Sequence, residues 1–161
     1  MGDERRGAVF ALWIVKNFPK AQHILDIAGG KGQVARKLAN KKRRVHVIDV
    51  DPRFEGRLHP RIFYQSGWFE EDSIIGKRFD LVVGMHPDEA TGEIIRYAIK
   101  HEIPFSVVPC CIKGRDARNI GSFTDWMKRL SSIAVKAGYS VQQDKLKMRG
   151  KNYIIVGKPC R

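Results

Sequence analysis

The segment His23-Ile24-Leu25-Asp26-Ile27-Ala28-Gly29-Gly30-Lys31-Gly32 decides the fold. Its aliphatic run predicts a buried strand over residues 23–28, and the glycines that follow predict a tight turn into a helix, since glycine alone tolerates positive φ without strain. The helix N-terminus beyond the turn offers unpaired N–H groups to a negatively charged ligand group. The segment therefore predicts a ligand-binding turn between a strand and a helix.

Short aliphatic runs alternate with helical stretches along the rest of the chain, which is typical of an α/β domain with a mainly parallel sheet. A short turn at Arg149-Gly150-Lys151 makes the last two strands antiparallel. We expect helices over 4–17, 33–40, 88–101 and 123–137, and strands over 23–28, 44–49, 61–64, 79–84, 105–110, 139–147 and 153–156. No repeat or linker divides the chain, so one domain over residues 1–161 is expected, with a doubly wound, mostly parallel seven-stranded sheet that ends in an antiparallel hairpin.

The chain is strongly basic, with 30 Lys and Arg against 17 Asp and Glu, a net charge of +13 and a pI near 10.0. Such a field attracts polyanions, so RNA or a ribonucleoprotein is the expected partner. No apolar run approaches the roughly 20 residues of a membrane span, and the N-terminus does not resemble a secretory signal. The 3 cysteines make no disulfide framework. We therefore expect an intracellular protein, without assigning it to the cytoplasm, the nucleus or an organelle.

Two classes of ligand compete for the glycine turn. The stretch from Gly30 to Ala35 matches the G-x-G-x-x-A pattern of dinucleotide sites, and Asp49 follows about 20 residues later at the end of the second predicted strand. A carboxylate there can accept hydrogen bonds from both ribose hydroxyls of an adenosine. However, Asp26 lies within the first strand, where dinucleotide sites usually have an apolar residue, and the chain lacks a second domain to hold a hydride acceptor. A nucleotide-binding oxidoreductase is therefore the weaker alternative.

The whole arrangement resembles the class I S-adenosylmethionine-dependent methyltransferases, which have a Rossmann-like fold. Their first motif, acid-x-Gly-x-Gly-x-Gly, is matched by Asp26, Ala28, Gly30 and Gly32, with alanine in place of the first glycine. The resemblance implies S-adenosylmethionine as cofactor. It places Asp26 and the backbone of 28–32, including Gly29, at the methionine moiety, and Asp49 at the ribose. Asp51 is the alternative to Asp49 for the ribose contact. The cofactor-contacting set is completed by Gln65 and Trp68 at the adenine and by His86. For Trp68 the simpler interpretation, which is favoured, is an ordinary rim or core aromatic residue.

The methyl acceptor should lie at the carboxyl ends of the fourth and fifth strands, because ligands bind there in open α/β sheets. His86, which follows the fourth strand, can accept a proton near neutral pH. Asp88 either orients His86 or caps the helix that starts there, and capping is favoured because a long amphipathic run follows directly.

Cys110 and Cys111 end the fifth predicted strand, so we expect one of them to face the crevice and the other to pack inward. A cysteine nucleophile that attacks a pyrimidine ring is an alternative, but the Pro-Cys motif of RNA enzymes of that kind is replaced here by the sequence of 86–89. A zinc site at His86, Cys110 and Cys111 lacks a Cys-x-x-Cys pair and a clear fourth ligand, so no metal is expected.

The combination of Gly-x-His after the fourth strand and Cys-Cys after the fifth resembles the Cys-Cys-containing methyltransferase-like proteins, which include tRNA ribose methyltransferases. This resemblance and the charge predict methyl transfer to tRNA or rRNA. Basic clusters stand at 41–44, at Lys113, Arg115 and Arg118, and along the final hairpin, which indicates a broad basic coat and a protein partner that supplies specificity. The alternatives are a catalytically silent methyltransferase-like scaffold of a ribonucleoprotein and a methyltransferase for small molecules or proteins.

Overall fold

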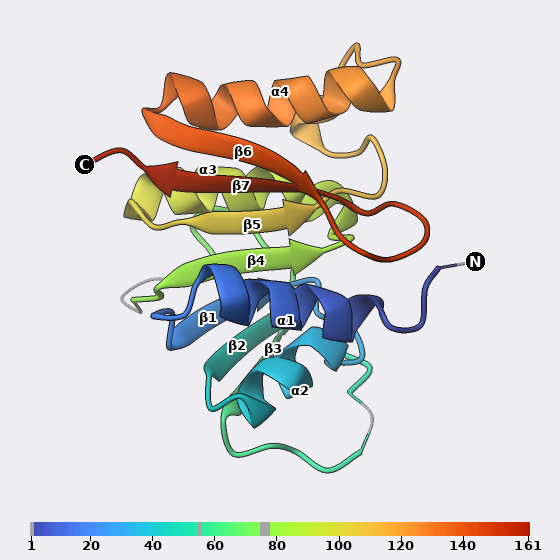
Figure 1. Cartoon of the computed structure of the whole chain (residues 1–161), viewed down its shortest axis with the longest axis vertical. Coiled ribbons are helices and arrows are strands. Elements are labelled where there is room, and N and C mark those ends of the chain that lie inside the picture. Colours follow the sequence, from blue (N-terminus) through green and yellow to red (C-terminus); the bar gives the residue numbers. More distant parts are fainter. Residues whose placement is uncertain (1, 55, 75–77) are drawn as a thin grey trace.

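The computed structural model describes residues 2–54, 56–74 and 78–161, and it has a central sheet between two layers of helices (Figure 1). The sheet has 7 strands in the order β3-β2-β1-β4-β5-β7-β6. The strands are β1 (His23–Ile27), β2 (Arg44–Asp49), β3 (Ile62–Ser66), β4 (Leu81–Met85), β5 (Phe105–Val108), β6 (Tyr139–Lys145) and β7 (Tyr153–Pro159). The helices are α1 (Arg6–Asn17), α2 (Gln33–Asn40), α3 (Thr91–His101) and α4 (Phe123–Lys136), with short 3₁₀ turns at η1 (Asp88–Ala90) and η2 (Arg115–Ala117).

The direction of the strands confirms the predicted architecture. β3, β2, β1, β4 and β5 pair in parallel, whereas β7 runs antiparallel between β5 and β6. The carboxyl ends of β1, β2 and β4 therefore meet at one edge of the sheet, and the turn at the start of α2 lies at the same edge. Among the described residues no helix has the length and the apolar character of a membrane span.

The two faces of the sheet carry separate cores because side chains alternate along each strand. Ile24 of β1 packs with Phe10 of α1 and Leu38 of α2 on one face. Leu25, its neighbour in sequence, packs with residues of α3 and α4 on the other face, including the fully buried Trp126. Both faces of the central strands are thus buried, which explains why these strands read as continuous aliphatic runs.

Most elements begin and end within three residues of their predicted limits, and the largest differences have local causes. β5 ends at Val108, not at residue 110, because Pro109 has no N–H to donate to a neighbouring strand. The helix expected from residue 88 is divided into η1 and α3. β7 extends beyond residue 156, to Pro159, because β6 pairs with it over its whole length.

Candidate functional site

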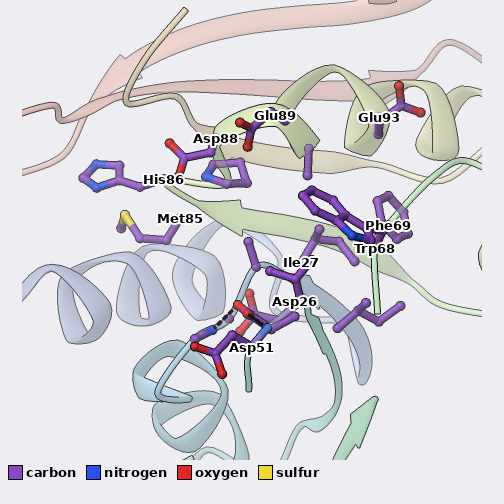
Figure 2. A pocket seen from close by; sticks show the side chains of 18 of the residues that line it. Asp26, Ile27, Asp51, Trp68, Phe69, Met85, His86, Asp88, Glu89 and Glu93 are labelled. Carbon is purple, nitrogen blue, oxygen red and sulfur yellow. Dashed lines mark hydrogen bonds between the residues drawn. The ribbon is translucent and has the colours of Figure 1, made fainter. Parts of the chain in front are cut away.

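A cavity of about 690 Å³ opens at the carboxyl ends of β1, β2 and β4. Figure 2 shows Asp26 and Asp51 on one side of it, with His86 and Asp88 on a second side and Trp68 on a third. This is the edge at which the parallel strands of an open α/β sheet bind ligands. The glycine turn, the acid after β2 and the segment after β4 are thus brought together as the sequence predicts.

The turn after β1 is held in a conformation that few residues accept. Ala28 and Gly30 have φ values of 59° and 52°, so the alanine in the motif occupies the left-handed region that favours glycine. Gly29 is required for another reason. A Cβ atom there would lie 2.5 Å from Cγ1 of Val47 and 3.0 Å from a carboxylate oxygen of Asp26. The backbone of the turn is therefore packed directly against β1 and β2.

Asp26 is the most unusual residue of the cavity wall. Its side chain is 1% exposed, and neither carboxylate oxygen has a hydrogen-bond partner. Burial, with a smaller contribution from the charge of Asp49, raises the pKa of Asp26 to about 7. A buried carboxyl group without a partner is costly, and it is suited to a positively charged ligand group that would supply the missing interaction.

Asp49 ties the turn to the end of β2. One of its carboxylate oxygens accepts a hydrogen bond from the Gly30 amide at 2.8 Å, and the other accepts one from the Asp51 amide at 2.8 Å. A carboxylate has about four acceptor positions, so Asp49 can still accept hydrogen bonds from a bound ligand. Asp51 also lines the cavity.

Two exposed apolar side chains also line the cavity. Trp68 is 75% exposed and Val50 is 51% exposed, which is unusual for large apolar residues. The structure places Trp68 on the rim and not in the core. Sequence reasoning missed Val50, although its position directly after Asp49 was a usable signal.

Gln65, expected at the adenine, does not line the cavity, so the structure does not bring it into the predicted set. Its side-chain oxygen is 2.9 Å from Nε2 of His46, on the face of the sheet opposite to the Tyr64 side chain. The reason is the alternation along β3: Tyr64 points toward the turn, with its hydroxyl 3.5 Å from the Gly30 carbonyl oxygen, and its neighbour in the strand therefore points away.

His86 lines the cavity and is held by the hairpin loop between β6 and β7. Its Nε2 lies 2.8 Å from the carbonyl oxygen of Lys151. A carbonyl oxygen only accepts, so Nε2 carries the hydrogen and Nδ1 is the acceptor of a neutral ring. Burial is the main cause that lowers the pKa of His86, so the neutral form prevails at neutral pH.

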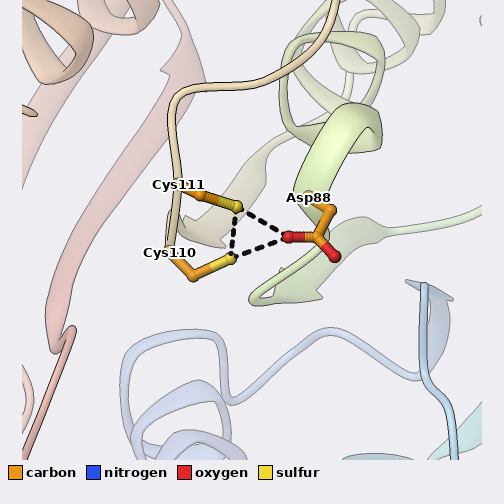
Figure 3. Close-up of side chains that lie close together, drawn as sticks. All are labelled: Asp88, Cys110 and Cys111. Atoms are coloured by element: carbon orange, nitrogen blue, oxygen red, sulfur yellow. Dashed lines mark hydrogen bonds between the residues drawn. The ribbon is translucent and has the colours of Figure 1, made fainter.

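The structure contradicts two expectations for Asp88 and the cysteines. Asp88 caps no helix, since Pro87 and Ala90 occupy the N-cap positions of η1 and α3 without a side-chain cap. Instead one Asp88 oxygen accepts hydrogen bonds from Cys111 and Cys110, as Figure 3 shows. Because the cysteines follow the end of β5, their side chains do not alternate, and both face Asp88 beside the cavity that Asp88 itself lines. Burial raises the pKa of both thiols, which does not favour a nucleophile.

Sequence reasoning also missed several charged residues of the cavity wall. Glu89 and Glu93, near the start of α3, line the cavity together with Arg115. A side-chain nitrogen of Arg115 lies 2.7 Å from a carboxylate oxygen of Glu93. Burial raises the pKa of Glu93, and Arg115 opposes that effect. The side of the cavity near β4 is therefore acidic although the whole chain is basic.

No family model matches the chain, and a search of curated proteins finds no match. Solved structures do match. DesVI of Streptomyces venezuelae shares 14% identity at a TM-score of 0.68, over 98% of this chain and 93% of DesVI. The glycopeptide N-methyltransferase MtfA, solved with S-adenosyl-L-methionine, shares 13% identity at a TM-score of 0.69, over 96% of this chain and 94% of MtfA.

A third match is the sugar N-methyltransferase KedS8 from a Streptoalloteichus species, with 13% identity and a TM-score of 0.68, over 98% of this chain and 88% of KedS8. These alignments span nearly the whole of this chain and most of each matched chain. The chain therefore has the Rossmann-like fold that these methyltransferases share. At this level of identity the likeness defines the fold, and the function has to be argued from the site.

Proposed function

We propose that the protein is an S-adenosylmethionine-dependent methyltransferase. The observation that carries the proposal is the unpartnered, buried carboxyl group of Asp26 in the cavity wall, next to the hydrogen-bonded Asp49. A methionine moiety brings an ammonium group, and a nearby positive charge stabilises a carboxylate that burial otherwise disfavours. The neighbours MtfA and KedS8, which are named as methyltransferases, have the same fold.

The residues of the cavity fit the parts of this cofactor. Asp26 would face the ammonium group, Asp49 would accept hydrogen bonds from the ribose hydroxyls, and Asp51 stands beside it as a second acceptor. Trp68 and Val50 provide apolar surface for a purine ring. When bound, S-adenosylmethionine supplies an electrophilic methyl group on a sulfonium ion. The protein's contribution is mainly to position cofactor and acceptor, since in-line displacement depends on geometry.

His86 is the proposed general base. The Lys151 carbonyl fixes Nε2 as the protonated nitrogen, so Nδ1 can accept the proton of an acceptor hydroxyl. The lowered pKa keeps the ring neutral at physiological pH, which is the form that a base requires. Asp88 has no comparable role in this proposal, because its hydrogen bonds run to the cysteines.

We further propose RNA as the acceptor, in line with the resemblance to tRNA ribose methyltransferases, and an intracellular site of action. The net charge of +13 supports a polyanionic partner. The loop that bonds His86 through Lys151 also carries the exposed Lys147 and Arg149, so a basic surface begins at the edge of the cavity. Contacts from this surface would go to the phosphate backbone and would carry little sequence information. A protein partner that supplies specificity is part of the proposal.

An amine acceptor is the second candidate, and the acidic side of the cavity favours it. Asp88, Glu89 and Glu93 line the wall near β4, where a cationic substrate would be stabilised and a phosphate repelled. Two of the structural neighbours are named as N-methyltransferases of a glycopeptide and a sugar. The two candidates differ in whether the labelled product is a polynucleotide.

The test is transfer of tritiated methyl groups from S-adenosylmethionine to total RNA and, in parallel, to a mixture of amino sugars and amines. We expect label in the RNA fraction, which ribonuclease treatment should convert to acid-soluble fragments. The rate of transfer should fall by more than about 100-fold in His86→Ala. His101→Ala, at the exposed end of α3, is the matched control and should keep full activity. Label in the amines alone would replace RNA by the second candidate. Binding of the cofactor without transfer to either would favour the silent scaffold.

A further inference from the structure

Asp88, Cys110 and Cys111 form a compact set of metal-ligating atoms beside the cavity (Figure 3). One Asp88 oxygen lies 2.7 Å from Sγ of Cys111 and 3.2 Å from Sγ of Cys110, and the two sulfur atoms are 3.1 Å apart. All three side chains are half-buried. The other carboxylate oxygen points away from the thiols, as Figure 3 shows. Two sulfur atoms and one oxygen atom thus converge on a single point.

The chain holds these groups together at a cost in backbone strain. Asp88 has a φ of 50°, in the left-handed region that non-glycine residues rarely adopt. Gly114, which closes the loop after the cysteines, has a φ of 93°, and a Cβ there would lie 2.6 Å from the Glu89 carbonyl oxygen. The loop after β5 is therefore packed closely against η1. Strain of this kind persists where the surrounding structure requires the geometry, which is common at ligand sites.

We propose that Asp88, Cys110 and Cys111 bind a thiophilic divalent cation of the zinc type. Zinc–sulfur bonds of about 2.3 Å and zinc–oxygen bonds of about 2.0–2.2 Å place tetrahedral ligands roughly 3.5–3.8 Å apart. The three atoms therefore need to open by less than about 1 Å, which small side-chain rotations provide. Three protein ligands leave a fourth position for water or a substrate group, as in zinc sites that exchange ligands.

No metal was expected from the sequence because it has no Cys-x-x-Cys pair and offered no clear fourth ligand. His86, which the sequence suggested as the third ligand, is turned toward the Lys151 carbonyl instead. Asp88 takes that place. Cys110 and Cys111 are separated from it by 22 and 23 residues, respectively.

Binding is an exchange of protons for the metal. Without a metal the two thiols donate to Asp88, and they are neutral. The cation replaces one proton on each sulfur, so two S–H bonds break, two metal–sulfur bonds form, and about two protons are released per metal. The formal charge of the site is one negative charge before and after binding. Lys113, whose Nζ lies 3.9 Å from the same Asp88 oxygen, is the counter-charge in both states.

The metal would join the loop after β5 to η1, directly behind the wall of the cavity. Asp88 belongs to that wall, whereas the cysteines lie behind it. Occupancy would therefore fix the segment that carries His86 and Asp88 and leave the formal charge of the site unchanged. The inference does not depend on the methyltransferase proposal, because it concerns the cluster alone.

The test is titration of the reduced, metal-free protein with Co²⁺, in which the thiolate-to-metal charge-transfer absorption reports binding. Zn²⁺ then displaces Co²⁺, and competition with a chromophoric chelator measures the affinity for Zn²⁺. We expect one metal per chain and release of about two protons. Cys110→Ser and Cys111→Ser should abolish the charge-transfer band, and Asp88→Asn should weaken zinc binding by more than about tenfold. Cys160→Ser is the matched control, because Cys160 is the exposed third cysteine and should not contribute.

Thermal unfolding of each variant separates loss of the site from loss of the fold, since Zn²⁺ should raise the melting temperature of the wild type and of Cys160→Ser but not that of Cys110→Ser or Cys111→Ser. The proposal is overturned if wild type and the two serine variants bind Zn²⁺ equally, or if the wild type shows no charge-transfer band while all three of its thiols are demonstrably reduced.

Discussion

Replacing Asp26 by asparagine should stabilise the ligand-free protein at neutral and alkaline pH. In the folded protein burial raises the pKa of Asp26 from 3.8 to about 7. Each pKa unit corresponds to about 1.4 kcal/mol, so ionised Asp26 costs the folded state at most about 4 kcal/mol. Asparagine removes that charge, but its amide N–H groups would also lack partners, which costs about 1–3 kcal/mol. The expected net gain in unfolding free energy is therefore between about 1 and 3 kcal/mol.

The sign of the pH dependence follows from the same shift. Between about pH 4 and pH 7 the folded protein binds more protons at Asp26 than the unfolded chain does, so this group makes the unfolding free energy fall as the pH rises. Its favourable contribution is fully present below the unfolded pKa and is lost once the pH exceeds the folded one. The advantage of Asp26→Asn should consequently be small near pH 4 and reach its full size above about pH 7.

Urea unfolding of both proteins at about pH 5 and about pH 8 measures this difference. Asp80→Asn is the control for the loss of a carboxylate, because Asp80 accepts hydrogen bonds from the amides of Gln22 and His23. This substitution should destabilise the protein. A lower stability of Asp26→Asn at about pH 8, or an advantage that does not change with pH, would refute the assignment of Asp26 as a buried, unpaired acid.

Three further predictions concern the cavity. Gly29→Ala should lower the unfolding free energy by about 1–3 kcal/mol, measured by urea unfolding, because the new methyl group overlaps Val47. Asp49→Ala should weaken S-adenosylmethionine binding by about 10–100-fold in a calorimetric titration, since it removes both a ligand contact and the anchor of Gly30; unchanged affinity would exclude Asp49 from the site. Trp68→Ala should change stability by less than about 0.5 kcal/mol because the side chain is 75% exposed, yet weaken the same binding several-fold; loss of both would mean that Trp68 is structural.

The fold was predictable because the two signals that define it are local. Each central strand is an aliphatic run, and the glycine turn after β1 marks the start of α2, whose predicted limits match the structure. The position of Asp26 and Asp49 at one edge follows from parallel strand order alone. The early end of β5 could also have been predicted from Pro109.

The failures of prediction have a different origin. The partners of Asp88 depend on its positive φ and on the loop after β5, and neither is encoded in the residues next to it. Gln65 was misplaced because β3 extends to Ser66, two residues beyond its predicted end. Gln65 therefore lies within the strand, on the face opposite to Tyr64, and not in the loop after it. Contacts between residues far apart in sequence were therefore the part that only the structure supplied.

The central claim is that the cavity binds S-adenosylmethionine with Asp26 ionised. Calorimetric titration of wild type and Asp26→Asn with S-adenosylmethionine, and of wild type with NADH, tests it most directly. We expect one site per chain in the wild type, release of a proton when binding is measured below about pH 7, a loss of at least about tenfold in the variant, and no heat with NADH. Equal binding by wild type and variant would contradict the role of Asp26, and binding of NADH in place of S-adenosylmethionine would contradict the account as a whole.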